Sequence, residues 1–67
     1  MPIIQVHMLS GRTHAQKTEL AEVLTREAAR IVRCTTEDIQ IVITEVQRSN
    51  WAVNGHLGNP APAVAAG

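Results

Sequence analysis

Two short stretches of alternating apolar and polar residues, separated by one amphipathic stretch, most constrain what this 67-residue chain can fold into. Residues 3–9 and 39–45 both have the two-residue period of a β-strand, and β-branched side chains dominate them. Each stretch is long enough for one strand. The sequence therefore predicts two strands at about residues 3–9 and 39–45.

The segment between these strands is expected to form one helix over about residues 14–33. Thr13 is followed three residues later by Gln16, which is the pattern of a capping box at a helix start. Apolar residues then recur at three- and four-residue steps from Leu20 to Val32. A helix of about twenty residues spans about 30 Å, which suits a crossover between parallel strands. The expected fold class is α/β (α+β), a single βαβ unit with a parallel two-stranded sheet.

Both faces of the predicted sheet carry large aliphatic side chains, such as Ile41 on one face and Val42 on the other. One helix covers only one face of a sheet. A chain of this length is hard to stabilise alone, and its single cysteine, Cys34, excludes an internal disulfide. We therefore expect oligomerisation to complete the sheet, with another chain covering the second face.

The C-terminal part of the chain contains one clear turn signal. Asn54-Gly55 lies between Val53 and Leu57 and predicts a small β-hairpin. Residues 58–67 carry no charged side chain, and two prolines interrupt them. The expected organisation is one domain over residues 1–57 followed by a mobile tail over residues 58–67.

Composition excludes several classes of function. Six Lys and Arg balance six Asp and Glu, and Trp51 is the only aromatic residue, so neither charge nor base stacking favours nucleic-acid binding. The longest run of large aliphatics, residues 41–43, is too short to span a membrane, and the first residues lack a signal-peptide pattern. The three histidines lack the spacing of metal ligands. We expect a cytoplasmic protein without a metal.

Pro2 is the first residue with potential chemistry. If Met1 is removed, Pro2 becomes a secondary amine at the chain end, and burial beside an arginine would lower its pKa toward neutrality. Such an amine is suited to act as a general base. The structural alternative is a rigid residue at a strand start, where a missing N–H does no harm.

Arg12 is the second candidate residue. It lies between the first predicted strand and the helix start, where free backbone N–H groups favour anions. A guanidinium there is suited to binding a carboxylate. The alternative is a solvated loop arginine.

Several motifs fall in order along the chain, namely Pro2, Gly11-Arg12, Gln16-Lys17, Thr44-Glu45 and Asn50-Trp51. As a set, and at this spacing, they resemble the 4-oxalocrotonate tautomerase family over residues 2 to about 57. The resemblance implies βαβ subunits that pair into dimers and assemble as a hexamer. It also implies cofactor-free keto–enol tautomerisation of 2-hydroxydienoates such as 2-hydroxymuconate, a reaction of aromatic catabolism.

The resemblance also implies roles for individual residues. Pro2 would take the enol proton and return it to a distal carbon, while Arg12 would bind a substrate carboxylate. Trp51 of a neighbouring subunit would exclude water and keep the Pro2 amine neutral. The wall of the pocket would be formed by Ile3, Leu9 and Val53.

Two positions leave the substrate and the reaction open. Gln40 stands where well-studied members of the family have a second arginine, and a neutral amide loses a charge-assisted contact. We expect a substrate with one carboxylate or a less acidic carbonyl end, or a related partner subunit that supplies the arginine in a hetero-hexamer.

Asp38 allows a second enzymatic interpretation, in which its carboxylate activates water for hydration, dehalogenation or decarboxylation. A solvated turn residue is its structural alternative. A non-catalytic, ligand-binding oligomer of the same fold is the competing class.

Overall fold

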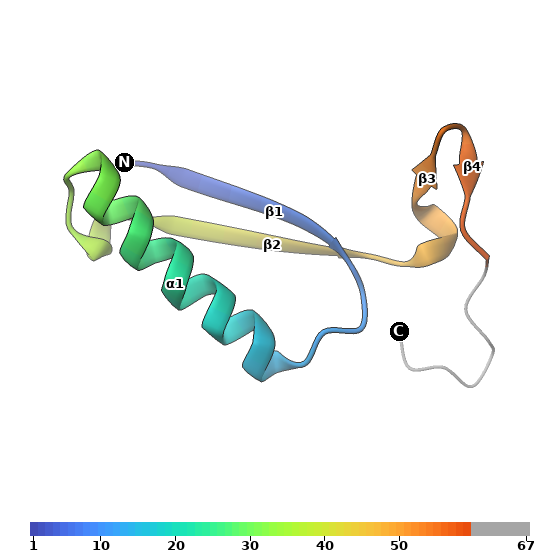
Figure 1. The fold of residues 1–67 in the computed structure, drawn as a ribbon, viewed down its shortest axis with the longest axis horizontal. Coiled ribbons are helices and arrows are strands. Elements are labelled where there is room, and N and C mark those ends of the chain that lie inside the picture. The colour runs from blue at the N-terminus through green and yellow to red at the C-terminus, as the bar shows by residue number, and fades with distance from the viewer. Residues whose placement is uncertain (60–67) are drawn as a thin grey trace.

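The computed structural model describes residues 1–59, and its elements follow the order β-α-β with a C-terminal hairpin (Figure 1). The elements are β1 (Ile3–Leu9), α1 (His14–Val32), η1 (Thr36–Asp38), β2 (Gln40–Val46), η2 (Arg48–Asn50), β3 (Ala52–Val53) and β4 (His56–Leu57). β1 and β2 pair in parallel, and β3 and β4 pair antiparallel in a second, smaller sheet. The predicted βαβ unit with a parallel two-stranded sheet and a small hairpin is confirmed.

The helix begins and ends as its local sequence dictates. The Thr13 side chain accepts a hydrogen bond from the Gln16 backbone N–H at 3.1 Å, and the Gln16 side chain accepts one from the Thr13 N–H at 2.9 Å. This reciprocal pair satisfies two backbone donors at the start of α1. At the other end, Arg33 adopts a left-handed conformation with φ 59°, and its N–H and that of Cys34 both bond to the Ala29 carbonyl. The predicted helix over residues 14–33 is confirmed to within one residue.

The second strand begins one residue later than the sequence pattern predicted. The η1 turn ends with the Ile39 N–H donating to the Thr36 carbonyl at 3.2 Å, so Ile39 still belongs to the turn. The sheet starts where the Gln40 N–H donates to the Pro2 carbonyl at 3.1 Å. Periodicity alone does not reveal this boundary, because Ile39 has the same apolar character as the strand residues that follow it.

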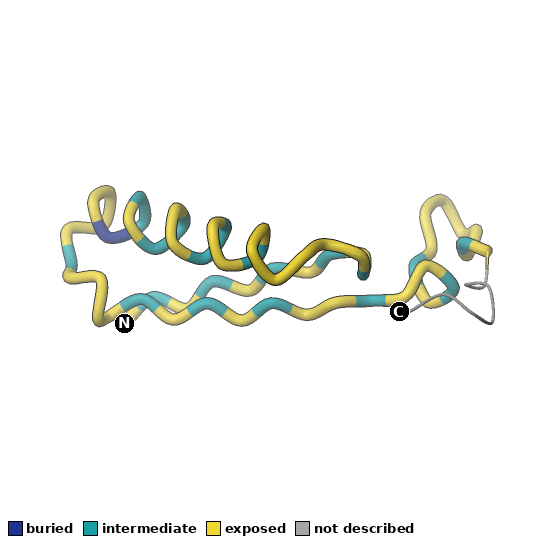
Figure 2. The backbone as a smooth tube through the Cα atoms, turned by 90° about the horizontal axis from the view of Figure 1, so that it is seen from below, coloured by how far each residue is buried: buried dark blue, intermediate teal, exposed yellow. Residues whose placement is uncertain are grey.

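Within residues 1–59, the sheet is covered on one face only. Figure 2 shows α1 along one side of the two strands and no element along the other. Side chains that face α1, such as Ile4 and Ile43, are half-buried, whereas Ile3 and Val42 on the other face are 57% and 49% exposed. Ala29, which is 7% exposed, is the only buried residue among residues 1–59. A βαβ unit with this little interior is not a stable core by itself.

The hairpin projects from the end of the molecule that lies opposite the N-terminus (Figure 1). Asn54 and Gly55 have φ values of 54° and 81°, as the mirror-image turn that joins two short strands requires. The predicted Asn-Gly hairpin is therefore confirmed. The expected tail lies mostly in residues 60–67, outside the described residues. No helix within residues 1–59 combines the length and the apolar character needed to cross a membrane.

Candidate active site

Pro2 lies half-buried immediately before β1, beside the first residues of β2. Its carbonyl accepts the Gln40 N–H, and Ile3 pairs with Gln40 in the sheet register. The Pro2 nitrogen takes no part in this ladder, because proline has no N–H. Met1, which precedes it, is 84% exposed and precedes the sheet. The structure thus brings together three of the predicted site residues, Pro2, Ile3 and Gln40.

Arg12 lies at the other end of β1, in the loop that leads to α1. It is exposed and borders a cavity of about 220 Å³ between β1 and α1, with Met8 and Lys17 among the other lining residues. Within residues 1–59, no carboxylate forms an ion pair with the Arg12 guanidinium. The side chain is therefore available to bind an anion.

A single chain does not bring Pro2 and Arg12 together. β1 runs from Ile3 to Leu9, and six steps of about 3.3 Å place the two ends of the strand roughly 20 Å apart. Trp51 follows β2 and η2, so it lies toward the Arg12 end, and Figure 1 shows the hairpin beyond that end. The predicted site residues are therefore divided between two opposite ends of the molecule.

The residues expected to line the pocket are exposed and divided in the same way. Ile3 is 57% exposed near Pro2, while Leu9 is 38% exposed at the far end of β1. Val53, on the hairpin, is 67% exposed. These side chains form no shared wall within one chain, so a pocket that contains all of them needs contributions from more than one copy.

Asp38 lies at the Pro2 end of the sheet, two residues before Gln40. Its carboxylate accepts hydrogen bonds from the Thr35 hydroxyl at 3.1 Å and from the Thr35 backbone N–H at 3.4 Å. These contacts cap the short η1 turn. The geometry thus gives a structural role to Asp38, the carboxylate for which the sequence also allowed a role in activating water.

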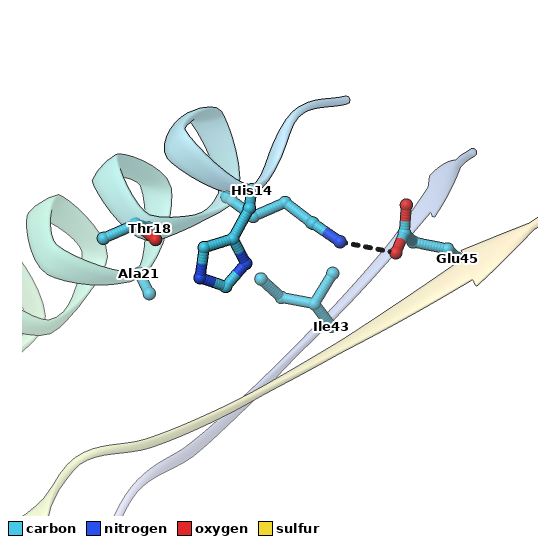
Figure 3. A pocket seen from close by; sticks show the side chains of 6 residues that line it. His14, Thr18, Ala21, Ile43 and Glu45 are labelled. Atoms are coloured by element: carbon cyan, nitrogen blue, oxygen red, sulfur yellow. Dashed lines mark hydrogen bonds and ion pairs between the residues drawn. The ribbon is translucent and has the colours of Figure 1, made fainter. Parts of the chain in front are cut away.

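A second cavity, of about 290 Å³, lies between α1 and β2 and contains the one long-range ion pair among residues 1–59 (Figure 3). The Lys17 ammonium lies 2.7 Å from a Glu45 carboxylate oxygen, and His14 and Ile43 line the same cavity. This pair connects the start of the helix to the second strand. No local pattern in the sequence identifies Lys17 as the partner of Glu45, because 28 residues separate the two.

The described residues offer no preformed metal site. Within residues 1–59, no three His, Cys, Asp or Glu side chains gather closely enough to hold an ion together.

Comparison with known proteins gives a consistent family. Residues 2–58 match the family described as tautomerase enzyme. A 2-hydroxymuconate tautomerase of Comamonas testosteroni is 33% identical over 55 residues, which is 82% of this chain and 87% of that protein.

Solved structures agree with the sequence comparison. A heterohexamer 4-oxalocrotonate tautomerase from Chloroflexus aurantiacus has a TM-score of 0.82 and 33% identity, over 85% of this chain and 92% of that one. A trans-3-chloroacrylic acid dehalogenase has a TM-score of 0.78 and 31% identity, over 87% and 100% of the two chains. The family match over residues 2–58 and these similarities in sequence and fold lead to one conclusion: this chain belongs to the tautomerase family.

Proposed function

We propose that this protein is a cofactor-independent tautomerase that converts 2-hydroxydienoate enols to keto acids, with the terminal amine of Pro2 as the proton carrier. The observation that carries the proposal is the position of Pro2. Its carbonyl anchors it to Gln40, while its nitrogen contributes nothing to the sheet, and the preceding Met1 is 84% exposed. Removal of Met1 would therefore free the amine without disturbing β1.

The chemistry needs only one group that moves a proton and one that holds the substrate. Burial of the Pro2 amine and a nearby cationic side chain, such as Arg12 of a second copy, would both disfavour its charged form and so lower its pKa toward neutrality. Pro2 removes the proton from the 2-hydroxyl group, the electron pair shifts along the conjugated chain, and the same proton is delivered to a distal carbon. No atom is gained or lost. The Arg12 guanidinium binds the carboxylate toward which negative charge moves in the transition state.

A second copy of the chain supplies the missing half of the site. The uncovered sheet face carries no Asp, Glu, Lys or Arg between the Ile3–Gln40 and Leu9–Val46 pairs, so it can pack against another copy without burying such a charge. Two copies related by a two-fold axis, with strands running in opposite directions, would place the Arg12 end of one chain near Pro2 of the other. Trp51 would arrive with Arg12 and exclude water. The hexamer expected from the sequence resemblance is our proposed assembly, and the structural relative from Chloroflexus aurantiacus is a heterohexamer.

Blocking Pro2 tests this function directly. The purified protein should have the intact mass of a chain that begins at Pro2, and it should accelerate the ketonisation of 2-hydroxymuconate or of phenylenolpyruvate, followed by ultraviolet absorbance. A version that keeps one extra residue before Pro2 should lose about 10²- to 10⁴-fold in rate, as expected for loss of a general base. Unchanged circular dichroism and size-exclusion elution would show that its fold and assembly are intact. Equal activity of the blocked and free chains would refute the proposal, and a mass that retains Met1 would favour the non-catalytic alternative.

The water-adding or decarboxylating alternative depends on Asp38. Its specific support is the similarity to structures of trans-3-chloroacrylic acid dehalogenase and of a member of the cis-3-chloroacrylic acid dehalogenase family. Against it stand the hydrogen bonds from Thr35, which engage the carboxylate in the η1 turn. The variant Asp38→Asn should leave tautomerisation intact. A loss of dehalogenation or decarboxylation in that variant, with tautomerisation preserved, would establish the second activity.

A further inference from the structure

We propose that Arg48 is a second carboxylate-binding residue of this site and that dicarboxylic enols are consequently its preferred substrate class. This inference rests on the proposed function, because it concerns the same pocket. It differs from the expectation drawn from Gln40, which favoured a substrate with one carboxylate. The argument follows from where the structure places the cationic side chains.

Arg12 and Arg48 come from the same edge of the sheet. β1 and β2 are parallel, so their carboxyl ends lie side by side, and the Ser10 N–H donates to the Val46 carbonyl at 3.0 Å at this edge. Arg12 follows Ser10 by two residues, and Arg48 follows Val46 by two residues. The topology thus brings to one edge of the sheet the two chain segments that carry Arg12 and Arg48, which are 36 positions apart in the sequence.

Both groups are available to a ligand. Of the six Lys and Arg side chains, three are engaged in ion pairs, namely Lys17 with Glu45 and both Arg26 and Arg30 with Glu27. Within residues 1–59, the other three, Arg12, Arg33 and Arg48, have no carboxylate partner. Arg33 ends α1 at the Pro2 end of the molecule (Figure 1), so Arg12 and Arg48 are the two free cations of the opposite end.

The surroundings of these two arginines leave their charge uncompensated. Residues 9–18 and 46–59, which contain them, include no Asp or Glu, and the adjacent Glu45 is already paired with Lys17. The chain as a whole has a formal net charge of zero. A local excess of two positive charges on a neutral protein favours a ligand with two negative charges at this edge.

The Arg48 backbone and side-chain stem are held in place next to Trp51. The Arg48 carbonyl accepts a hydrogen bond from the Trp51 N–H at 3.1 Å, and the Trp51 carbonyl accepts one from the Gly58 N–H at 3.1 Å. A side chain at Gly58 would collide with the Arg48 stem and carbonyl, the latter only 2.6 Å from a Cβ built there. The absence of a Cβ at Gly58 therefore lets the stem lie against the base of the hairpin. Any subunit contact that brings Trp51 to Pro2 carries Arg48 with it.

Two guanidinium groups from one copy remove the need for an arginine at position 40. Gln40 near Pro2 contributes hydrogen bonds but no charge, and an arginine forms a stronger, charge-assisted contact to a carboxylate. Arg12 would hold one carboxylate of a diacid, and Arg48 would hold the other or steer its approach. The rival assignment is that Arg48 forms an ion pair with an acidic side chain of a neighbouring copy, such as Glu37, which has no cationic partner within residues 1–59.

The test compares a diacid and a monoacid in the same variants. For Arg48→Gln, we expect kcat/KM for 2-hydroxymuconate to fall by about tenfold or more, mainly through KM, because a charged hydrogen bond is lost. The value for phenylenolpyruvate should stay within about twofold. Arg48→Lys should recover part of the diacid activity, since it keeps the charge but not the planar fork. Arg33→Gln, which removes the free cation of the opposite end, is the matched control and should change neither substrate.

Three results would overturn the inference. The first is an equal loss of kcat/KM on both substrates in Arg48→Gln, and the second is an unchanged kcat/KM for the diacid. The third is a smaller assembly of Arg48→Gln on size-exclusion chromatography, which would assign Arg48 to a subunit contact. Binding of cis,cis-muconate, a dicarboxylate without an enol, is measured by calorimetry on the wild type and on Arg48→Gln. If the wild type turned over neither enol, the proposed function would fail. The role of Arg48 in carboxylate binding would then be tested by the binding of cis,cis-muconate alone. Equal affinity of the wild type and Arg48→Gln for this dicarboxylate would refute that role.

Discussion

The two faces of the small sheet come from the same fourteen strand residues but have opposite environments. On the face toward α1, alternate aliphatic side chains are half-buried, as for Val6 and Ile41. On the other face, Ile3 and Val42 are 57% and 49% exposed. Residues 1–59 therefore cover one face and leave the other exposed, and we propose that a second copy packs on the exposed face. The two-residue period identifies both faces of the sheet but does not say what packs on each.

The two faces also differ in the charged side chains that they carry. The covered side includes Glu45 near the end of β2, and Lys17 of α1 neutralises it at 2.7 Å. The uncovered face mixes apolar residues with neutral polar ones such as Gln5 and Thr44, and His7 is its only titratable residue. Such a face tolerates water in the free chain and also tolerates burial against a second copy. The comparison predicts that mutations on the two faces fail in different ways.

The largest effect is expected on the covered face. Ile41→Asp places a carboxylate against α1 without a partner, which costs about 3–5 kcal/mol and is comparable to the whole stability of a small domain. The variant should be unfolded at every protein concentration, as judged by circular dichroism and urea titration. Ile41→Val, the matched control, should lose only about 0.5–1.5 kcal/mol. A folded Ile41→Asp protein would show that α1 does not form the cover that the structure assigns to it.

A smaller effect that depends on concentration is expected on the uncovered face. Val42→Asp should weaken association by about tenfold or more, equivalent to about 1.4 kcal/mol, because the carboxylate must lose water at the subunit contact. Analytical ultracentrifugation over a range of concentrations measures this shift, and Val42→Thr serves as the control of similar shape. Unaltered assembly of Val42→Asp would place the interface on another surface and would remove the support for a two-copy site.

The smallest effect concerns the ion pair that connects helix and sheet. A double-mutant cycle with Lys17→Met and Glu45→Gln should give a coupling energy of about 0.5–1 kcal/mol, since both side chains keep some exposure, 25% and 34%. The free energy of unfolding in urea is the measured quantity, and raising the salt concentration should reduce the coupling. A coupling near zero would mean that apolar packing alone positions α1 on the sheet.

Local signals predicted most of the fold because each of them depends on nearby residues. The capping box of Thr13 and Gln16 sets the helix start, and Asn54-Gly55 sets the hairpin, since both act over only a few positions. The start of β2 was predicted one residue early, because the η1 turn bonds Ile39 in a way that its side chain does not signal. The partner of Glu45 was not predicted, since a contact across 28 residues leaves no periodic trace.

The candidate site was predictable in its residues but not in its geometry. Pro2 and Arg12 could be selected from their chemistry and their place in the chain, whereas their separation by the length of β1 became apparent only from the parallel sheet. Arg48 carried no local signal at all. Its relevance depends on the register that places Val46 beside Leu9 and on the space left by Gly58.

The sequence by itself determined the strands, the helix and the turn and indicated the candidate site residues, because these follow from backbone preferences and side-chain chemistry over short distances. Only the tertiary structure decided which sheet face stays open, which cations remain unpaired and which ends of the molecule hold Pro2 and Arg12. The physical reason is that parallel pairing joins segments that lie far apart in the chain, so charge balance and exposure are settled by neighbours in space rather than in sequence.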